Sequence, residues 1–522
     1  MNYNQIKAIK YILGGVILIG LLFTVLNFNN NNGDPLVNLV FAKSFKNGFF
    51  YYGNEGPKSG STSPLMVLIT APFYLLKVSS PIIYIKIFYI IIFLLTGYLF
   101  YLLGRKLFTH PLAPLILSAL FLGNIWFGYL TATLYDSILL FLVLICFYHI
   151  FIDCYSCIKE KEQLSYGTGI ILGIIGSLAL LARPDSGIAL LVGYGWLLLE
   201  LWKNNKRGEN YNNLCVILSS FLVCFILGGG FYFLLGIKTG QFIPTSVLAR
   251  ATLKSNSFSQ SILKILTSHF YVYYLYFGYL CLSFLAFIFY IKHRNDYFRN
   301  AELIKLLFLT AILYFPIFLY SSETRYVSAA FPAMIILSVY SIVQIFEWFR
   351  AQKRIPLLVA LLFILFSVYS MYSYKIFTRI SFYPEDIIIE KTLCNYLNPI
   401  VQPSEKVAAY EVQIQYCLNS QIISLDGIVG GEILPYFYAY SDLSDFFKKY
   451  RPNYLILSDY VVYREEYYGT ILETLFKSDN DAKLGDELTI KGIKFTKMLQ
   501  NEEQKMPGMR MWDSVYRINY ET

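Results

Sequence analysis

The chain has 522 residues, of which 56% are hydrophobic, 18% aromatic and only 15% charged, and its formal net charge is +9. This composition excludes a water-soluble globular protein and predicts an integral membrane protein. Residues 1–379 contain 29 Lys and Arg against 13 Asp and Glu, whereas residues 380–522 contain 14 against 21. The basic excess therefore belongs to the apolar part of the chain, and it indicates membrane topology rather than nucleic-acid binding.

Apolar stretches long enough to cross a bilayer recur along residues 1–379, and we count about eleven predicted transmembrane helices. They lie near residues 10–28, 81–104, 111–128, 137–153, 166–183, 187–202, 213–236, 270–291, 302–320, 326–347 and 355–374. If the N-terminus is cytosolic, every second connecting loop is basic, as the positive-inside rule requires. The sequence thus predicts a mostly α, polytopic protein of the cell (inner) membrane.

Two longer polar segments of this domain are predicted to be external. The first external loop covers residues 29–80, and the second large one covers residues 237–268. Near the end of the first loop, "SPLMVLITAPFYLL" at residues 63–76 is apolar but too short to span a bilayer. We therefore predict an interfacial or re-entrant helix there.

Residues 380–522 differ in pattern and predict a soluble α/β domain. "KVAAYE" and "NYLILSD" indicate strands, "DLSDFFKKY" a helix, and "ELTIKGIKFTKML" a hairpin that turns at Lys491 and Gly492. Because eleven spans precede it, we expect this C-terminal domain to be extracytoplasmic. Cys394 and Cys417 both lie in it, and an oxidising compartment would allow them to form a disulfide.

The predicted topology places seven charged residues on the external side or at helix ends that open to it. They are Asp34, Asp136, Arg183, Asp185, Arg250, Lys254 and Arg325. Charges in or beside apolar helices are costly, so their gathering on one side indicates a functional site. A transporter would more often place such groups near the bilayer midplane.

Two stretches of the first external loop resemble a known family. "GDPLVNLVFAKSFKNG" at residues 33–48 and "SGSTSPLM" at residues 59–66 are similar to the start and end of this loop in the GT-C superfamily of membrane glycosyltransferases. The likeness is to bacterial arabinofuranosyltransferase-like and mannosyltransferase-like members. Gly33, Val40 and Ser59 replace an Asp, an Arg and a Glu of the family pattern, so Asp34 alone matches as the catalytic carboxylate.

Four further stretches follow in the family's order. They are "ATLYDSILLFL" with Asp136, "LARPDSG" with Arg183 and Asp185, "GQFIPTSVLAR" with Arg250, and "ETRYVSAAFP" with Arg325. The resemblance implies a GT-C fold and transfer of a sugar from a polyprenyl-phosphate donor, with inversion, to a glycan, lipid or protein acceptor at the extracytoplasmic face. It assigns no certain cofactor, and a divalent metal ion remains open.

The resemblance and the chemistry together suggest roles for these residues. Asp34 would accept the proton of the acceptor hydroxyl as general base. Arg250 and Arg325, with Lys254 in reserve, would bind the donor phosphate as it gains charge. Asp136, Arg183 and Asp185 are assigned to acceptor binding or to a structural role. No metal ligand is assigned, because the C-x-x-C pair of Cys154 and Cys157 has no partners.

Each candidate also has a simpler interpretation that stays open. Asp34 is alternatively a loop residue or the N-cap of a helix that starts at Pro35. Asp136 is alternatively a helix cap, Arg183 and Asp185 a pair that stabilises a turn, and Arg325 an interfacial anchor. Arg250 and Lys254 are four residues apart and would equally suit a solvated helix face. For the whole chain, the competing hypotheses are a transporter or lipid flippase and a catalytically decayed membrane assembly protein.

Overall fold

A computed structural model gives the structure of the protein. It describes residues 3–28, 33–53, 56–76, 80–204, 211–243, 270–292, 297–317, 324–351, 394–409, 412–425, 429, 432–433, 435, 443–458, 487–490, 492–499 and 513–520. The chain divides into two compact units. The helical unit comprises Met1–Asn30, Ile82–Phe231 and Asn256–Phe382, and the loop–tail unit comprises Asn31–Pro81, Tyr232–Ser255 and Tyr383–Thr522.

The helical unit is built from long apolar helices, because inside a bilayer the backbone polar groups must be satisfied within the segment itself. Its helices are α1 (Tyr3–Leu26), α4 (Pro81–Leu107), α5 (Ala113–Leu122), α6 (Ile125–Ala132), α7 (Ser137–Glu160), α8 (Tyr166–Ala182), α9 (Gly187–Asn204), α10 (Tyr211–Cys224), α14 (Phe270–Lys292), α15 (Glu302–Leu313) and α17 (Phe331–Ala351). The 3-10 turn η2 (Pro184–Ser186) joins α8 to α9, and η4 (Thr324–Ala330) precedes α17. A π-helical turn, η3 (Phe225–Gly229), joins α10 to α11 (Gly230–Thr239).

Five described segments are long and apolar enough to cross a membrane. They are Ile9–Leu26, Pro81–Leu107, Ser137–Glu160, Tyr211–Thr239 and Val327–Phe349. A sixth results if α5 and α6, which are bent by 50° relative to each other, form one broken span. These helices identify a membrane protein. The other predicted spans within the described residues are also helical but do not meet this standard, and the span at 355–374 lies outside those residues, so the total of eleven stays a prediction.

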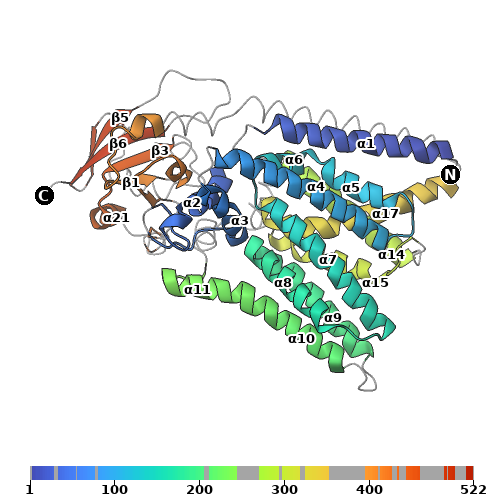
Figure 1. Ribbon diagram of the computed structural model, residues 1–522. Helices are drawn as coiled ribbons and strands as arrows, with labels where there is room; N and C mark the ends of the chain where they lie inside the picture. Colours follow the sequence, from blue (N-terminus) through green and yellow to red (C-terminus); the bar gives the residue numbers. More distant parts are fainter. Residues whose placement is uncertain are drawn as a thin grey trace. The chain divides into compact units, whose positions relative to one another are not determined.

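The predicted cytosolic loops meet at one end of the helical unit. The backbone N–H of Arg299, ahead of α15, donates to the carbonyl of Leu107 at the end of α4, at 2.8 Å. Lys159 near the end of α7 donates to the Asn300 side chain at 3.2 Å. Figure 1 shows α7, α8, α9 and α10 running beside one another, and α7 packs against both α8 and α9. These contacts place residues of three predicted cytosolic loops at the same end of the described helices.

Glycine allows α1 to approach the α5–α6 bend closely. A Cβ atom on Gly20 would lie 2.1 Å from the carbonyl oxygen of Leu122, and one on Gly123 would lie 2.4 Å from Val16. Asn124 then caps the new helix, because its side-chain oxygen accepts the N–H of Trp126 at 2.9 Å. Small residues commonly permit this close helix packing in membranes.

The loop–tail unit combines the first external loop with the C-terminal domain. Its loop elements are α2 (Gly33–Ser44), η1 (Phe45–Asn47) and α3 (Pro64–Leu75). Its tail elements are β1 (Lys406–Ala409), η5 (Val412–Tyr416), β2 (Gln421–Ser424), α21 (Leu443–Tyr450), β3 (Tyr454–Ser458), β4 (Glu487–Ile490), β5 (Ile493–Leu499) and β6 (Asp513–Tyr520). The predicted short apolar helix is α3, whose 12 residues extend about 18 Å and so fall short of a bilayer's apolar thickness.

The tail strands form one mixed sheet in the order β2-β1-β3-β6-β5-β4. Strand β1 is parallel to β2 and β3, and the remaining pairs are antiparallel. The predicted strands, helix and hairpin are confirmed; at the hairpin turn, Gly492 takes a φ of 78° that suits glycine. Figure 1 shows α21 beside the sheet, and its buried Phe447 packs edge-on against Phe495 with ring centroids 5.8 Å apart.

Candidate functional site

Helix α2 changes the interpretation of the first external loop. The segment after residue 32 is helical, and α2 begins at Gly33. Asp34 therefore lies in its first turn, so its backbone is helical and does not belong to an irregular loop. Leu39, Val40 and Phe41 on this helix are almost fully buried. The apparent polar gap between two spans thus starts with a packed helix.

A buried amide joins the two ends of the first loop. The Ser61 hydroxyl donates to the side-chain oxygen of Asn38 at 2.9 Å, and the Asn38 amide donates to the Thr62 hydroxyl at 3.2 Å. Asn38 lies one helical turn after Asp34. The segments 33–48 and 59–66 are therefore in contact. Sequence reasoning did not single out Asn38, although an Asn within an apolar helical run was the available signal.

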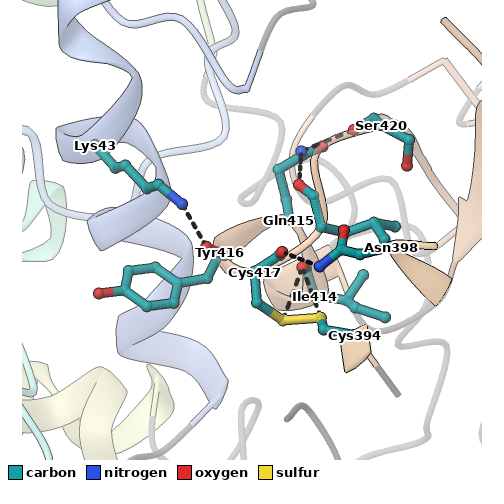
Figure 2. The surroundings of a disulfide bond; sticks show 9 residues. Lys43, Cys394, Asn398, Ile414, Gln415, Tyr416, Cys417 and Ser420 are labelled. Carbon is teal, nitrogen blue, oxygen red and sulfur yellow. Dashed lines mark hydrogen bonds between the residues drawn. A yellow bond between two sulfur atoms is a disulfide. The ribbon is translucent and has the colours of Figure 1, made fainter. Parts of the chain in front are cut away.

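Helices α2 and α3 also contact η5 of the tail, and Figure 2 shows Lys43 of α2 beside Tyr416. The Lys43 ammonium donates to the backbone carbonyl of Tyr416 at 2.7 Å and lies 5.3 Å from the centre of its ring. The hydroxyls of Tyr74, on α3, and Tyr416 are 3.2 Å apart. Burial, and secondarily the nearby Lys46, lower the pKa of Lys43, and burial raises the pKa of Tyr74. These contacts attach the loop to the tail with partly desolvated groups.

Two further contacts join the remaining parts of the loop–tail unit. Lys58 forms an ion pair with Glu432 of the tail, and both side chains are mostly buried. The Ser59 hydroxyl donates to the side-chain oxygen of Gln241 at 3.0 Å. Ser59 replaces a Glu of the family pattern, and Gln241 belongs to the predicted second external loop. The beginning of that loop therefore lies against the end of the first.

A buried charged triad occupies the end of the helical unit away from the basic loops. Arg183 donates from Nη1 to Asp136 at 3.0 Å and from Nε to Asp185 at 3.0 Å. The side chains of Arg183 and Asp136 are only 8% and 6% exposed. Burial raises the pKa of Asp185 against the opposing effect of Arg183. A single guanidinium thus stabilises two carboxylates in an apolar setting.

Helix geometry explains where the triad forms. Asp136 precedes α7, Asp185 precedes α9, and Arg183 is the C-cap residue of α8. The two carboxylates lie at helix N-termini, which carry a partial positive charge, and Arg183 lies at a C-terminus, which carries a partial negative charge. Both arrangements are favourable. The carboxylate of Asp136 makes no capping hydrogen bond, so the capping interpretation is wrong for its side chain. The 3.0 Å contact of Arg183 with Asp185 fits the predicted turn-stabilising pair.

Several polar groups surround this triad. The Ser137 and Ser328 hydroxyls are 3.0 Å apart, which places η4 beside the start of α7. Within the described part of the chain, Asp185 Oδ2 and the Ser186 hydroxyl are buried without a hydrogen-bond partner. The hydroxyl of Tyr314 donates to the backbone carbonyl of Asp185 at 2.6 Å. The triad is therefore part of a larger polar junction between helix ends.

The predicted site residues are divided between the two units. Asp136, Arg183 and Asp185 lie together in the helical unit, and Arg325 belongs to the neighbouring turn η4. Asp34 belongs to the loop–tail unit. Arg250 and Lys254 lie outside the described residues. Among the residues that are described, no cluster of three or more His, Cys, Asp or Glu side chains is arranged to hold a metal ion.

Lys86 is a buried charge that sequence reasoning did not select. It lies near the start of α4, and its ammonium donates to the backbone carbonyl of Phe28, just after α1. A single Lys within the apolar run "PIIYIKIFYI" was the signal that could have identified it. Its contact joins the end of α1 to the start of α4.

Comparison of the sequence with protein-family models gives no match, and comparison with curated proteins gives none either.

Proposed function

We propose that the chain is a GT-C type glycosyltransferase. It would transfer a sugar from a polyprenyl-phosphate donor to a glycan, lipid or protein acceptor on the extracytoplasmic face of the cell membrane. The main support is the contact of Asn38 with Ser61 and Thr62. It brings together the two segments that resemble the family's first loop, with Asp34 one turn away on α2.

The proposed reaction is a single displacement. The acceptor oxygen attacks the anomeric carbon while Asp34 takes its proton, and the bond from that carbon to the phosphate oxygen breaks with the electron pair leaving on the phosphate. One displacement inverts the anomeric centre. Arg250 and Arg325, with Lys254 in reserve, supply positive charge for the leaving phosphate. The polyprenyl chain of the donor accounts for an enzyme built into the membrane.

Two observations support an extracytoplasmic tail. Cys394 and Cys417 form a disulfide, and such bonds persist mainly in oxidising compartments. In addition, the basic loops gather at the end of the helical unit away from the Asp136–Arg183–Asp185 triad, as expected if that basic end is cytosolic. The position of the triad at helix ends also counts against a transporter, which would favour charges near the midplane.

One observation favours a second candidate, a membrane assembly protein that has lost catalysis. Val40 stands where the family pattern has an Arg, and it is 1% exposed within the packed face of α2. An Arg side chain could not be accommodated there without repacking, so this substrate contact is absent from α2. This hypothesis and the enzymatic one differ in what they predict for Asp34.

The test is donor turnover by the purified chain in membranes that contain the natural acceptors. A panel of polyprenyl-phosphate-linked pentoses and hexoses is supplied, and release of free polyprenyl phosphate is measured. We expect Asp34→Asn to abolish release while donor binding persists. Asp445→Asn is the matched control, because Asp445 is an exposed acid on α21 in the same unit. Undiminished release by Asp34→Asn would rule out the proposed mechanism, and no release by the unaltered chain would favour the assembly protein.

A further inference from the structure

Two consecutive residues of η5 contact the first loop. Tyr416 binds Lys43 through its carbonyl and Tyr74 through its hydroxyl. At Gln415, the loop backbone comes so near that a Cβ atom on Gly53 would lie 2.9 Å from the Gln415 side chain. Gly53 also has a φ of +59°, so glycine suits this position for both reasons. The turn η5 therefore contacts α2, α3 and the loop between them.

Hydrogen bonds attach η5 to the sheet of the tail. The Gln415 amide donates to the carbonyls of Leu418 at 3.0 Å and Ser420 at 2.8 Å, and its oxygen accepts the N–H of Ile422 in β2 at 3.1 Å. Gln415 is buried, so these bonds are shielded from water. They connect η5 to the strand that follows it.

A covalent bond also attaches the end of η5 to an earlier part of the tail. Cys417, the residue after Tyr416, is joined to Cys394 by the disulfide, with their Cα atoms 6.0 Å apart (Figure 2). The Asn398 amide adds a hydrogen bond to the carbonyl of Cys417 at 3.0 Å. The carbonyl that binds Lys43 is thus only one residue from the cross-link. Motion of η5 away from α2 would require this part of the tail to move with it.

We infer that the Cys394–Cys417 disulfide positions the first loop through Tyr416 and Lys43, so that the chain holds α2 in its working place only in the oxidised form. This inference rests on the proposed function insofar as α2 presents Asp34. Cys394, Cys417, Tyr416 and Lys43 are positioning residues, since none of them needs to touch a substrate. Loss of the cross-link would leave η5 attached through the hydrogen bonds of Gln415 and Asn398 and would loosen α2.

Release of the loop would follow reduction by a dithiol. A thiolate of the dithiol attacks the sulfur of Cys417, which is half-buried, whereas Cys394 is 2% exposed. The sulfur–sulfur bond breaks, Cys394 leaves as a thiolate and takes up a proton, and a mixed disulfide forms at Cys417. The second thiol of the reductant then displaces Cys417. Two electrons pass to the protein, and the reductant becomes a disulfide.

Hydrogen exchange of the full chain, in lipid nanodiscs and with or without dithiothreitol, tests the inference. We expect reduction to speed amide exchange in Gly33–Ser44 and Pro64–Leu75 by about tenfold, while Ser137–Glu160 of the helical unit is unaffected. The double variant Cys394→Ser and Cys417→Ser should reproduce this without reductant. Unchanged exchange in both segments would overturn the inference.

A pair of variants keeps the test decisive if reduction unfolds the whole tail. Lys43→Met removes the donor to Tyr416 but leaves the disulfide intact, and Lys43→Arg retains a charged donor. We expect faster exchange in α2 for the Met variant and rescue by the Arg variant, with β3 and β6 unaltered. Equal exchange in the two variants would refute the role of this contact.

The exchange readout also separates this inference from the proposed function. If α2 loosens on reduction but the oxidised chain never turns over a donor, the positioning role stands and the glycosyltransferase proposal fails. If the oxidised chain is active and reduction alters neither exchange nor turnover, the enzyme proposal stands and the positioning role fails.

Discussion

Replacement of Arg183 by Met should destabilise the helical unit strongly. The change removes two 3.0 Å ion pairs and leaves the carboxylates of Asp136 and Asp185, which are 6% and 20% exposed, without their cation. Breaking a buried ion pair from one side typically costs about 3–5 kcal/mol, because the remaining charge is buried and uncompensated. We expect a loss of about 3–5 kcal/mol in the free energy of unfolding, measured by titrating the purified chain with SDS in mixed micelles.

Further variants locate the origin of this loss. Simultaneous Arg183→Met, Asp136→Asn and Asp185→Asn removes every charge and should recover most of the stability, since neutral replacements of buried ionic groups are often tolerated. Arg105→Met is the control, because Arg105 is an exposed residue in the last turn of α4, and it should change stability by less than about 0.5 kcal/mol. A loss below about 1 kcal/mol for Arg183→Met would refute the structural role. The substrate-contact hypothesis for the triad would then be favoured.

Three other predictions concern a buried hydrogen bond, helix packing and an ion pair. Asn38→Leu leaves the Ser61 hydroxyl without its acceptor. It should lower the free energy of unfolding by about 1–3 kcal/mol and speed amide exchange in α2. No change in exchange would contradict this prediction. A leucine at position 20 cannot fit beside Leu122, so Gly20→Leu should detach α1, which is detected as loss of a cross-link between α1 and α5. Gly14→Leu is the control, because Gly14 has open space around it, and should be neutral. Equal behaviour of the two variants would refute this prediction. Lys58→Met leaves the mostly buried carboxylate of Glu432 without its cation and should lower the free energy of unfolding by about 1–3 kcal/mol, with little dependence on salt; a loss below about 0.5 kcal/mol that disappears at high salt in an unfolding titration would contradict it.

Features that depend on local pattern could be predicted from the sequence. Long apolar runs predict helices wherever water cannot satisfy the backbone, and the helices found at α4, α7 and α17 follow from this. The hairpin of β4 and β5 was equally predictable, because Gly492 marks the turn between two short apolar runs. Each of these signals is contained within a few tens of residues.

Which distant groups meet could not be predicted from local pattern and depends on tertiary packing. Arg183 and Asp136 are 47 residues apart, and nothing in either segment specifies that the guanidinium fills the space beside the start of α7. The contact between Lys43 and Tyr416 spans 373 residues. It depends on how α2 packs against η5, on the β1–β2 pairing and on the disulfide. Such contacts result from the summed packing of many side chains, whereas helix and strand formation is governed largely by neighbours along the chain.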